Sequence, residues 1–237
     1  MIKFFRKIRQ NLLSEGKTGK YLKYAIGEII LVVIGILIAL QLNNLNENKK
    51  NDKFEKEILS QIQENLKSDR IVLKKIELNF NKAIACSYKI LNAEESQKTR
   101  DSIKIWLGAI IQFDRFQPLT NAYEVLKSNG LDRISNKQLR FLLGKYYDDD
   151  ALRMIKSTND IELAFNDHWI PILFEDTVEF EFKKSVELSD YTVLLKPSKE
   201  RNILKLNRDN YASGITKIMS GISTIEEIQN LITKEIN

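Results

Sequence analysis

Few side chains in this sequence have both the chemistry and the number that an active site needs. The 237 residues include one histidine, His168, and one cysteine, Cys86. A zinc site or a nucleophile–histidine–acid triad requires more imidazole or thiolate groups than these two residues provide. We therefore expect His168 to pack or cap at a helix end and Cys86 to be a small buried apolar side chain. An intermolecular disulfide in an oxidising compartment is the alternative for Cys86.

Acidic residues are the remaining candidates for catalysis or metal binding. Asp148, Asp149 and Asp150 follow one another without the alternating spacing of a calcium-binding loop, and on a helix they spread over the surface. We interpret them, and the acidic residues of 175–181, as solvated faces. A carboxylate-based active site that uses Glu124, Asp148 or Asp149 is the alternative, and it requires these groups to converge in a pocket. Because the glycine motifs of nucleotide-binding and hydrolase folds are also missing, we predict no catalytic residue, no cofactor and no metal site.

An almost unbroken apolar segment precedes all of these residues, over positions 24–42. At ~1.5 Å per residue a helix over this segment is about 28 Å long, which matches a hydrocarbon core of ~30 Å. A buried core helix normally shows a polar stripe, and residues 29–40 have none. A cleaved signal peptide needs a small-residue cleavage site, and the sequence after Ala39 is a poor one. The segment therefore predicts one uncleaved transmembrane helix, with the lipid bilayer as its partner.

Charge is concentrated on one side of this segment. Residues 1–23 carry a net charge of +6, the segment carries only Glu28, and the whole chain carries +5, so residues 43–237 are neutral overall. Since cytoplasmic flanks are rich in Lys and Arg, we expect a cytoplasmic N-terminus and an extracytoplasmic C-terminal domain. A neutral domain lacks the positive surface that nucleic-acid binding requires, so we predict no nucleic-acid partner. The residues expected to contact the membrane surface are Lys3, Arg6, Lys7, Arg9, Lys17, Lys20 and Lys23.

One face of the predicted span has the composition of a helix–helix contact. Glu28, Gly35 and Ala39 are separated by seven and four residues, so they share a helical face, and small residues on such a face let two helices approach closely. This predicts a second copy of the chain or another membrane protein as a partner. The alternative for Glu28 is that its carboxylate reaches the headgroups or pairs with Lys20 or Lys23.

Apolar residues recur at three- and four-residue steps through the rest of the chain. They predict a long helix over residues 47–91, with the stripe interrupted by Asp69, and a long final helix from residue 199. Residues 172–182 alternate in places, but an isolated strand has no partner, so we expect a short helix there and a long connection over 183–199. Shorter helices are predicted near 102–113, 121–130 and 135–170, with Asp101 or Ser102, Thr120 and Ser135 as N-caps.

These elements predict an all-α protein: a single transmembrane helix followed by an antiparallel helical bundle with long first and last helices. The predicted domains are a basic amphipathic cytoplasmic head (residues 1–23), the transmembrane helix (24–42) and an extracytoplasmic helical domain (43–237). The polar residues after position 42 act either as a hinge or as a continuation of the anchor helix.

Two stretches resemble one known family. They are YAIGEIILVVIGILIALQLNN at 24–44, preceded by the basic MIKFFRKIRQ, and NAYEVLKSNGLDRISNKQLR at 121–140. Both are similar to a family of bacterial membrane proteins described as domain of unknown function 6090. Leu45 departs from the pattern, which has Trp after the two Asn residues. The resemblance implies a single-span bacterial inner-membrane protein with an extracytoplasmic helical domain, and it supplies no activity, substrate or catalytic residue.

The sequence therefore favours a non-enzymatic membrane protein whose helical domain is an interaction, structural or sensory module. A sensory role requires a separate partner, because a head of 23 residues is too small for an output domain. The membrane-anchored, carboxylate-based enzyme described above is the alternative.

Overall fold

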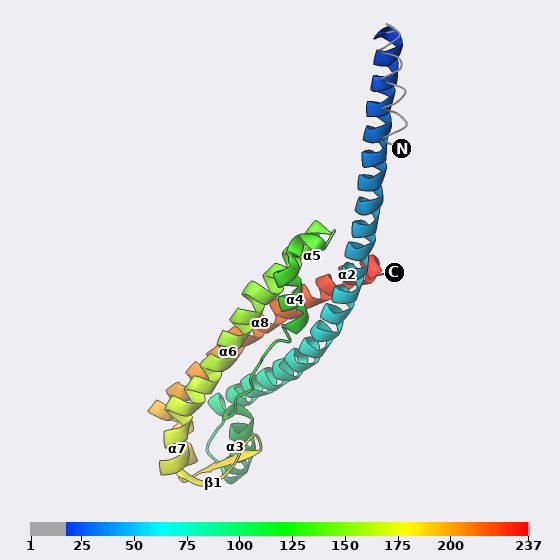
Figure 1. Cartoon of the computed structure of the whole chain (residues 1–237). Coiled ribbons are helices and arrows are strands. Elements are labelled where there is room, and N and C mark those ends of the chain that lie inside the picture. Colours follow the sequence, from blue (N-terminus) through cyan, green and yellow to red (C-terminus); the bar gives the residue numbers. More distant parts are fainter. Residues whose placement is uncertain (1–17, 237) are drawn as a thin grey trace. The chain divides into compact units, whose positions relative to one another are not determined.

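The computed structural model describes residues 18–236 and divides the chain into two compact units (Figure 1). The first unit extends to Phe54, and the second, called the body below, begins at Glu55. The amphipathic helix predicted for residues 1–13 lies outside the described residues. Helices dominate both units, as predicted, with one small hairpin in the body.

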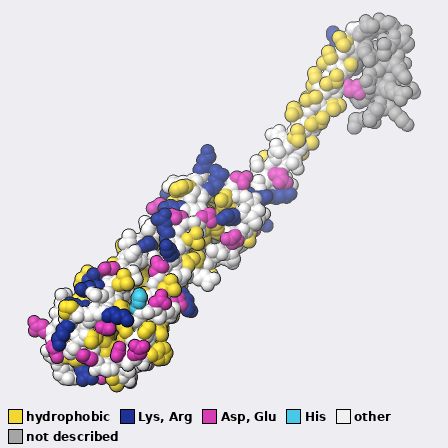
Figure 2. Space-filling model, turned by 90° about the vertical axis from the view of Figure 1, so that its left-hand side faces the viewer, with side chains coloured by type: hydrophobic (Ala, Val, Ile, Leu, Met, Phe, Trp, Pro, Cys, Tyr) yellow, Lys and Arg dark blue, Asp and Glu magenta, His cyan; other side chains and the backbone are white. Residues whose placement is uncertain are grey.

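Helix α2 (Thr18–Leu91) supplies the whole described part of the first unit. Its apolar residues from 26 to 42 are exposed, and hydrophobic side chains cover this part of the helix in Figure 2. No residue of its most apolar stretch is buried, and the helix is long and apolar enough to cross a membrane. The polar residues after position 42 are helical too, so the second of the two alternatives, a continuous helix, is the correct one.

The body is framed by the second half of α2 and by α8 (Lys199–Ile236), which run antiparallel. The predicted stripe of α2 is its buried face and includes Ile62, Leu73 and Phe80. Residues of the two helices meet in reverse order along the chain, in the pairs Gln63–Thr233, Arg70–Glu226, Phe80–Tyr211 and Leu91–Arg201.

A helical run from α5 to α7 packs along α8 (Figure 1). Two glycines of α8 make close packing possible, because a Cβ at Gly214 would meet the ring of Phe80 and a Cβ at Gly221 would meet the side chain of Met154. The run consists of α5 (Lys137–Lys145), a π-helical turn (Tyr146–Asp150), α6 (Ala151–Ala164), a second π-helical turn (Phe165–Trp169) and α7 (Ile170–Glu175).

The helix predicted to end or kink at residues 169–171 does not end there, and a second π turn directly precedes Ile170. The run continues to Glu175, with Pro171 in the first turn of α7. Proline lacks an N–H and crowds the carbonyl group four residues earlier. A π turn has a wider hydrogen-bond spacing, so the turn directly before α7 accommodates Pro171 without ending the helix.

Two helix starts differ from the predicted ones. Helix α3 (Gln97–Ile110) begins earlier than expected, because Ser96 is its N-cap and accepts a hydrogen bond from the Thr99 N–H. Helix α5 is capped by Asn136, not Ser135, and the Asn136 side chain accepts from the Gln138 and Leu139 N–H groups. Helix α4 (Asn121–Asn129) follows Thr120 as predicted, and a short 3-10 turn (Leu131–Arg133) follows Gly130.

The prediction for residues 172–199 was right only at its start, where α7 is a short helix that ends at Glu175. The rest of it was wrong. Strand β1 (Thr177–Glu181) pairs antiparallel with β2 (Ser185–Leu188), so the partner strand lies in the segment expected to be a long connection. The residue that turns the chain is Lys183, with a φ of 64°. Glycine or asparagine normally occupies a left-handed turn position, so the hairpin carried no turn signal in the sequence. A 3-10 turn (Tyr191–Leu194) leads from the hairpin to α8.

Candidate functional site

Most of the predicted membrane-surface residues lie outside the described part of the chain. Lys20 and Lys23 belong to α2, and the Lys23 side chain is exposed. The others lie outside the described residues, and these are Lys3, Arg6, Lys7, Arg9 and Lys17.

The predicted contact face of the span lies on α2. Glu28, Gly35 and Ala39 all lie on α2, and no described atom outside the helix comes within 4 Å of a Cβ built at Gly35. Ala39 is exposed and Glu28 is partly exposed. A self-associating face looks like this in a single chain, so association of the span stays a prediction.

The carboxylates of the enzyme alternative do not converge. Asp148 accepts hydrogen bonds of 2.9 Å from Tyr123 Oη and from Lys127 Nζ, whereas Asp149 pairs with Arg153 at 2.7 Å. Glu124 is exposed on α4. Burial raises the pKa of the Asp148 carboxyl, but the hydrogen bonds from Lys127 and Tyr123 outweigh it, so this pKa lies below its usual value. Among residues 18–236 no group of three His, Cys, Asp or Glu side chains is placed to hold a metal ion.

The third carboxylate of this run, Asp150, is buried and not on a solvated face as expected. Its Oδ2 atom accepts hydrogen bonds from Lys145 Nζ at 2.6 Å and from Thr224 Oγ1 at 2.7 Å. Because the π turn directs Asp150 toward α8, the carboxylate joins the α5–α7 run to the last helix. Its role is structural.

Asp69, which interrupts the stripe of α2, sets a contact between elements. Its carboxylate accepts from Tyr146 Oη at 2.7 Å and from the Leu119 N–H at 3.0 Å. Burial raises the pKa of Asp69 above its usual value, and the two hydrogen bonds oppose this effect only in part. The same burial raises the pKa of the Tyr146 hydroxyl, which thus stays a protonated donor at neutral pH.

The remaining two candidates are His168 and Cys86. His168 is partly exposed in the second π turn, inside the helical run and not at a helix end as expected, and it belongs to no described group of three side chains that could hold a metal ion. Cys86 is a free, buried thiol, as expected, and burial raises its pKa. A buried thiol with a raised pKa is a poor nucleophile.

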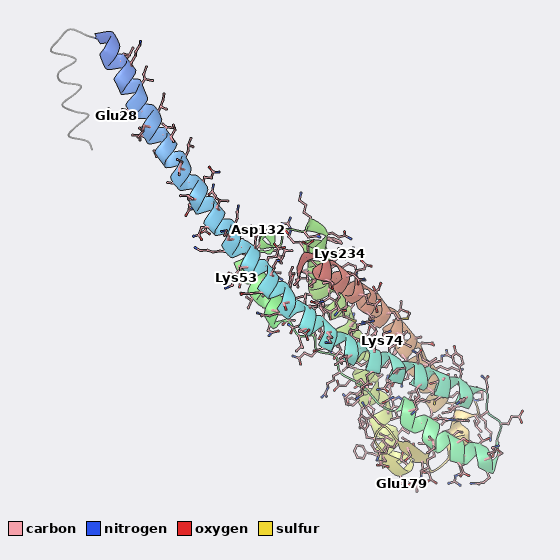
Figure 3. The ribbon with its side chains drawn as sticks, turned by 90° about the vertical axis from the view of Figure 1, so that its right-hand side faces the viewer. Glu28, Lys53, Lys74, Asp132, Glu179 and Lys234 are labelled. Atoms are coloured by element: carbon pink, nitrogen blue, oxygen red, sulfur yellow. The ribbon has the colours of Figure 1, made fainter. Side chains whose placement is uncertain are left out.

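Apolar side chains on and beside the hairpin are exposed. Phe174, at the end of α7, is 83% exposed, and Val178, on β1, is 66% exposed. Phe180 and Phe182 are 39% and 40% exposed. We call these four residues, together with the glutamates Glu175, Glu179 and Glu181 beside them, the hairpin surface. Glu179 lies at the end of the body opposite Lys234 (Figure 3).

The hairpin surface rests on a rigid support. Val186 and Leu188 of β2 are buried in a cluster with Ile103 and Leu107 of α3. Gly108 of α3 lies directly against the hairpin backbone, where a Cβ would meet the Lys184 carbonyl group. Lys104 Nζ bonds to Glu179 at 2.5 Å and to Glu187 at 2.9 Å, and so ties both strands to α3.

Aromatic rings connect the exposed hairpin to the core. Phe182 lies between Phe180 (ring centroids 6.4 Å apart) and Phe113 (5.5 Å), and Phe113 contacts the buried Phe165 at 5.1 Å. Ring contacts of this kind add about 0.5–1.5 kcal/mol each to the burial of apolar area. The rings of Phe180 and Phe182 are thus connected to the core.

The fold defines a mostly helical protein in which one helix of membrane-spanning length and composition continues into a body with its own core. Residues 28–195 match DUF6090, a family of unknown function, and this match covers most of the chain. The chain belongs to this family, which confirms the predicted resemblance. No curated protein and no solved structure matches the chain.

Sequence reasoning missed the hairpin surface, although part of the signal was present. Residues 177–181 (TVEFE) and 185–188 (SVEL) both alternate apolar with polar residues, which is the period of a strand. The pairing was hidden because a turn with lysine at its left-handed position does not look like a turn. The acidic residues of 175–181 were interpreted as a solvated face, and they were not predicted to lie on and beside a strand.

Proposed function

We propose that this protein is a single-span protein of the bacterial inner membrane, and that its body is an extracytoplasmic, non-enzymatic interaction module. The observation that carries the proposal is the exposed apolar part of α2, none of which is buried. A soluble protein would cover such a surface, since large contiguous apolar patches are unfavourable in water. A bilayer covers it instead.

The orientation in this proposal follows from charge. Seven basic residues precede the span, and the flank that follows it mixes lysines with acidic residues. Positive residues are retained on the cytoplasmic side, so the body is placed outside the cytoplasm.

Reporter fusions test the orientation. Alkaline phosphatase, which is active only outside the cytoplasm, is fused after Asn237, and a cytoplasm-only reporter is fused at the same position in a second strain. We expect phosphatase activity and a silent cytoplasmic reporter. The reverse result would overturn the orientation. A matched control in which the seven basic residues of the head are changed to glutamine should lose the preferred orientation.

The non-enzymatic part of the proposal rests on how the carboxylates are used. Asp148, Asp149 and Asp150 each bond to a basic or hydroxyl side chain, and Glu124 is exposed on α4. This arrangement gives no support to the carboxylate-based enzyme. The hairpin surface supports an interaction role, because it is apolar, exposed and preorganised.

Photo-crosslinking in native membranes tests the interaction role. A crosslinking phenylalanine analogue replaces Phe174, and the matched control carries it in place of Phe141, which is 70% exposed on α5. We expect a discrete crosslinked partner from position 174 and little product from position 141. Equal, diffuse products from both positions would contradict an interaction role for the hairpin end.

A further inference from the structure

Strand β1 has one free edge. In the described part of the chain β1 pairs only with β2, and the sheet has two strands. The side chains of β1 after Thr177 are all exposed. The other edge of β1 therefore presents backbone N–H and C=O groups that a further strand can pair with.

The side chains along this edge favour a partner. The pairing register shifts between Thr177 and Glu179, so Val178 has no cross-strand partner in β2. Val178 is instead exposed, as are Phe180 and Phe174. Natural proteins protect free edges with bulges and charges, and the bulge and the glutamates of β1 fit that role. Exposed Val and Phe side chains on the same strand do not protect the edge, because they favour binding of another apolar segment.

Charge restricts what can pair here. Residues 174–189 contain five acidic residues and two lysines. Both lysines are already held by acidic partners, Lys183 by Asp114 and Lys184 by Glu181. Lys104 of α3 in turn holds Glu179 and Glu187, so the hairpin carries five acidic residues against three lysines, these two and Lys104. It is therefore acidic as well as apolar, and a complementary strand carries apolar and basic residues in alternation.

The same charges exclude two other occupants. A second copy pairing through its own β1 would set glutamates against glutamates, and like charges on neighbouring strands are destabilising. An anionic lipid surface would be repelled by the acidic residues, since such surfaces attract basic segments.

We infer that β1 binds, by strand addition, an extended segment of another protein in which apolar residues alternate with Lys or Arg. Backbone pairing with the free edge provides the affinity, and contacts with Val178, Phe180 and the glutamates provide the selectivity. The inference rests on the proposed function, because it names the partner class of the same interaction module.

Peptide binding to the full chain tests this inference. The protein is placed in nanodiscs of zwitterionic phosphatidylcholine, so that a cationic peptide does not adhere to the lipid. The probe is a fluorescent octapeptide of alternating lysine and valine, and binding is measured by anisotropy. Empty nanodiscs are the blank. We expect saturable binding, together with slower amide hydrogen exchange of residues 177–181 when the peptide is present.

Two altered peptides separate strand addition from simple charge attraction. N-methylation of alternate backbone amides on the pairing edge should weaken binding about tenfold, because the hydrogen bonds to β1 are lost while the charge is unchanged. A peptide with the same residues in two blocks, all lysines then all valines, should bind at least as weakly. Equal binding of all three peptides would overturn the inference.

Charge-swapped variants provide a readout that mere structural damage would not produce. The double variant Glu179→Lys/Glu181→Lys should lose the lysine–valine peptide and gain an alternating glutamate–valine peptide. The matched control is Asp160→Lys/Asp167→Lys, which changes the same charge at exposed positions of α6 and the following π turn. The control should keep the original preference. If both double variants showed the same peptide preference, the inference would be contradicted.

The two proposals fail separately. Crosslinking from position 174 without peptide binding would leave the interaction module standing and remove strand addition. Peptide binding by a body that the reporters place in the cytoplasm would remove the proposed orientation and leave strand addition standing.

Discussion

The carboxylate of Asp69 on α2 accepts a hydrogen bond of 2.7 Å from the hydroxyl of Tyr146, which lies in the first π turn. Both side chains are buried, and Asp69 also accepts from the N–H of Leu119, in the segment before α4. One carboxylate thus connects three parts of the body. This polar interruption of the α2 stripe is the point at which the middle of the chain is held in register.

Removing this carboxylate should destabilise the body strongly. Asp69→Ala leaves the Tyr146 hydroxyl and the Leu119 N–H without their acceptor, and each unsatisfied buried group costs about 1–3 kcal/mol. We expect the free energy of unfolding to fall by about 2–4 kcal/mol, measured by denaturant unfolding of the full chain in detergent with tryptophan fluorescence. The control, Asp149→Ala, breaks an exposed ion pair with Arg153 and should cost less than about 1 kcal/mol. Similar losses in both variants would contradict this role.

The raised pKa of Asp69 predicts a specific dependence of stability on pH. Its ordinary pKa is 3.8, and burial raises the pKa in the folded state. Above pH 3.8 the folded protein therefore binds more protons at this site than the unfolded protein does, so this contribution to the free energy of unfolding decreases as pH rises through the folded pKa. Below pH 3.8 both states are protonated and the contribution is constant.

Asp69→Asn removes this titration and keeps one acceptor oxygen. We expect the wild-type chain to gain stability relative to Asp69→Asn as the pH is lowered from neutral toward 4. Other carboxyl groups with lowered pKa values, such as Asp148 and Glu162, titrate in both proteins and cancel in the difference. A difference that does not change with pH would show that Asp69 does not titrate in this way.

Two glycines offer a matched test of how the hairpin is supported. Gly108→Ala places a Cβ against the backbone of Lys184 and Ser185, so the hairpin must move away from α3. Overpacking of this kind costs about 1–3 kcal/mol. Gly144→Ala, in α5, meets no described atom within 4 Å and should stabilise the helix by about 0.5–1 kcal/mol. Thermal unfolding of both variants in detergent checks the opposite signs, and a stabilising Gly108→Ala would contradict the close contact.

The sequence predicted the elements whose pattern is local and regular. The stripes of α2 and α8 are continuous, and their residues, such as Ile62 and Ile225, are buried as expected. In the α5–α7 run the buried residues still recur at three- and four-residue steps across the first π turn, as Leu143, Tyr147, Asp150 and Met154 show. Leu152 does not follow this period and is 58% exposed.

The hairpin surface could not be predicted, because its existence depends on a pairing between two short segments and on a turn at Lys183. Each strand is too short to be recognised from its own sequence. The hairpin packs against Gly108, which is far away in the sequence. Likewise, the buried contact of Asp150 with Thr224 joins two residues that are far apart in the sequence. Strand pairing and buried polar contacts depend on the tertiary structure, so the spacing of apolar residues along the sequence does not reveal them.

Self-association of the span is the last prediction, and it concerns the face of Glu28, Gly35 and Ala39. If two spans meet on this face, Gly35→Leu separates them, and we expect the fraction of crosslinked dimer in membranes to fall about fivefold, which corresponds to about 1 kcal/mol. Val33→Leu enlarges a side chain about 200° away around the helix and serves as the control. Glu28→Gln should weaken the dimer if the carboxylate takes part in the contact, and should leave it unchanged if the carboxylate reaches the headgroups instead. Equal dimer fractions in the wild-type chain, Gly35→Leu and Val33→Leu would show that this face is covered by lipid alone.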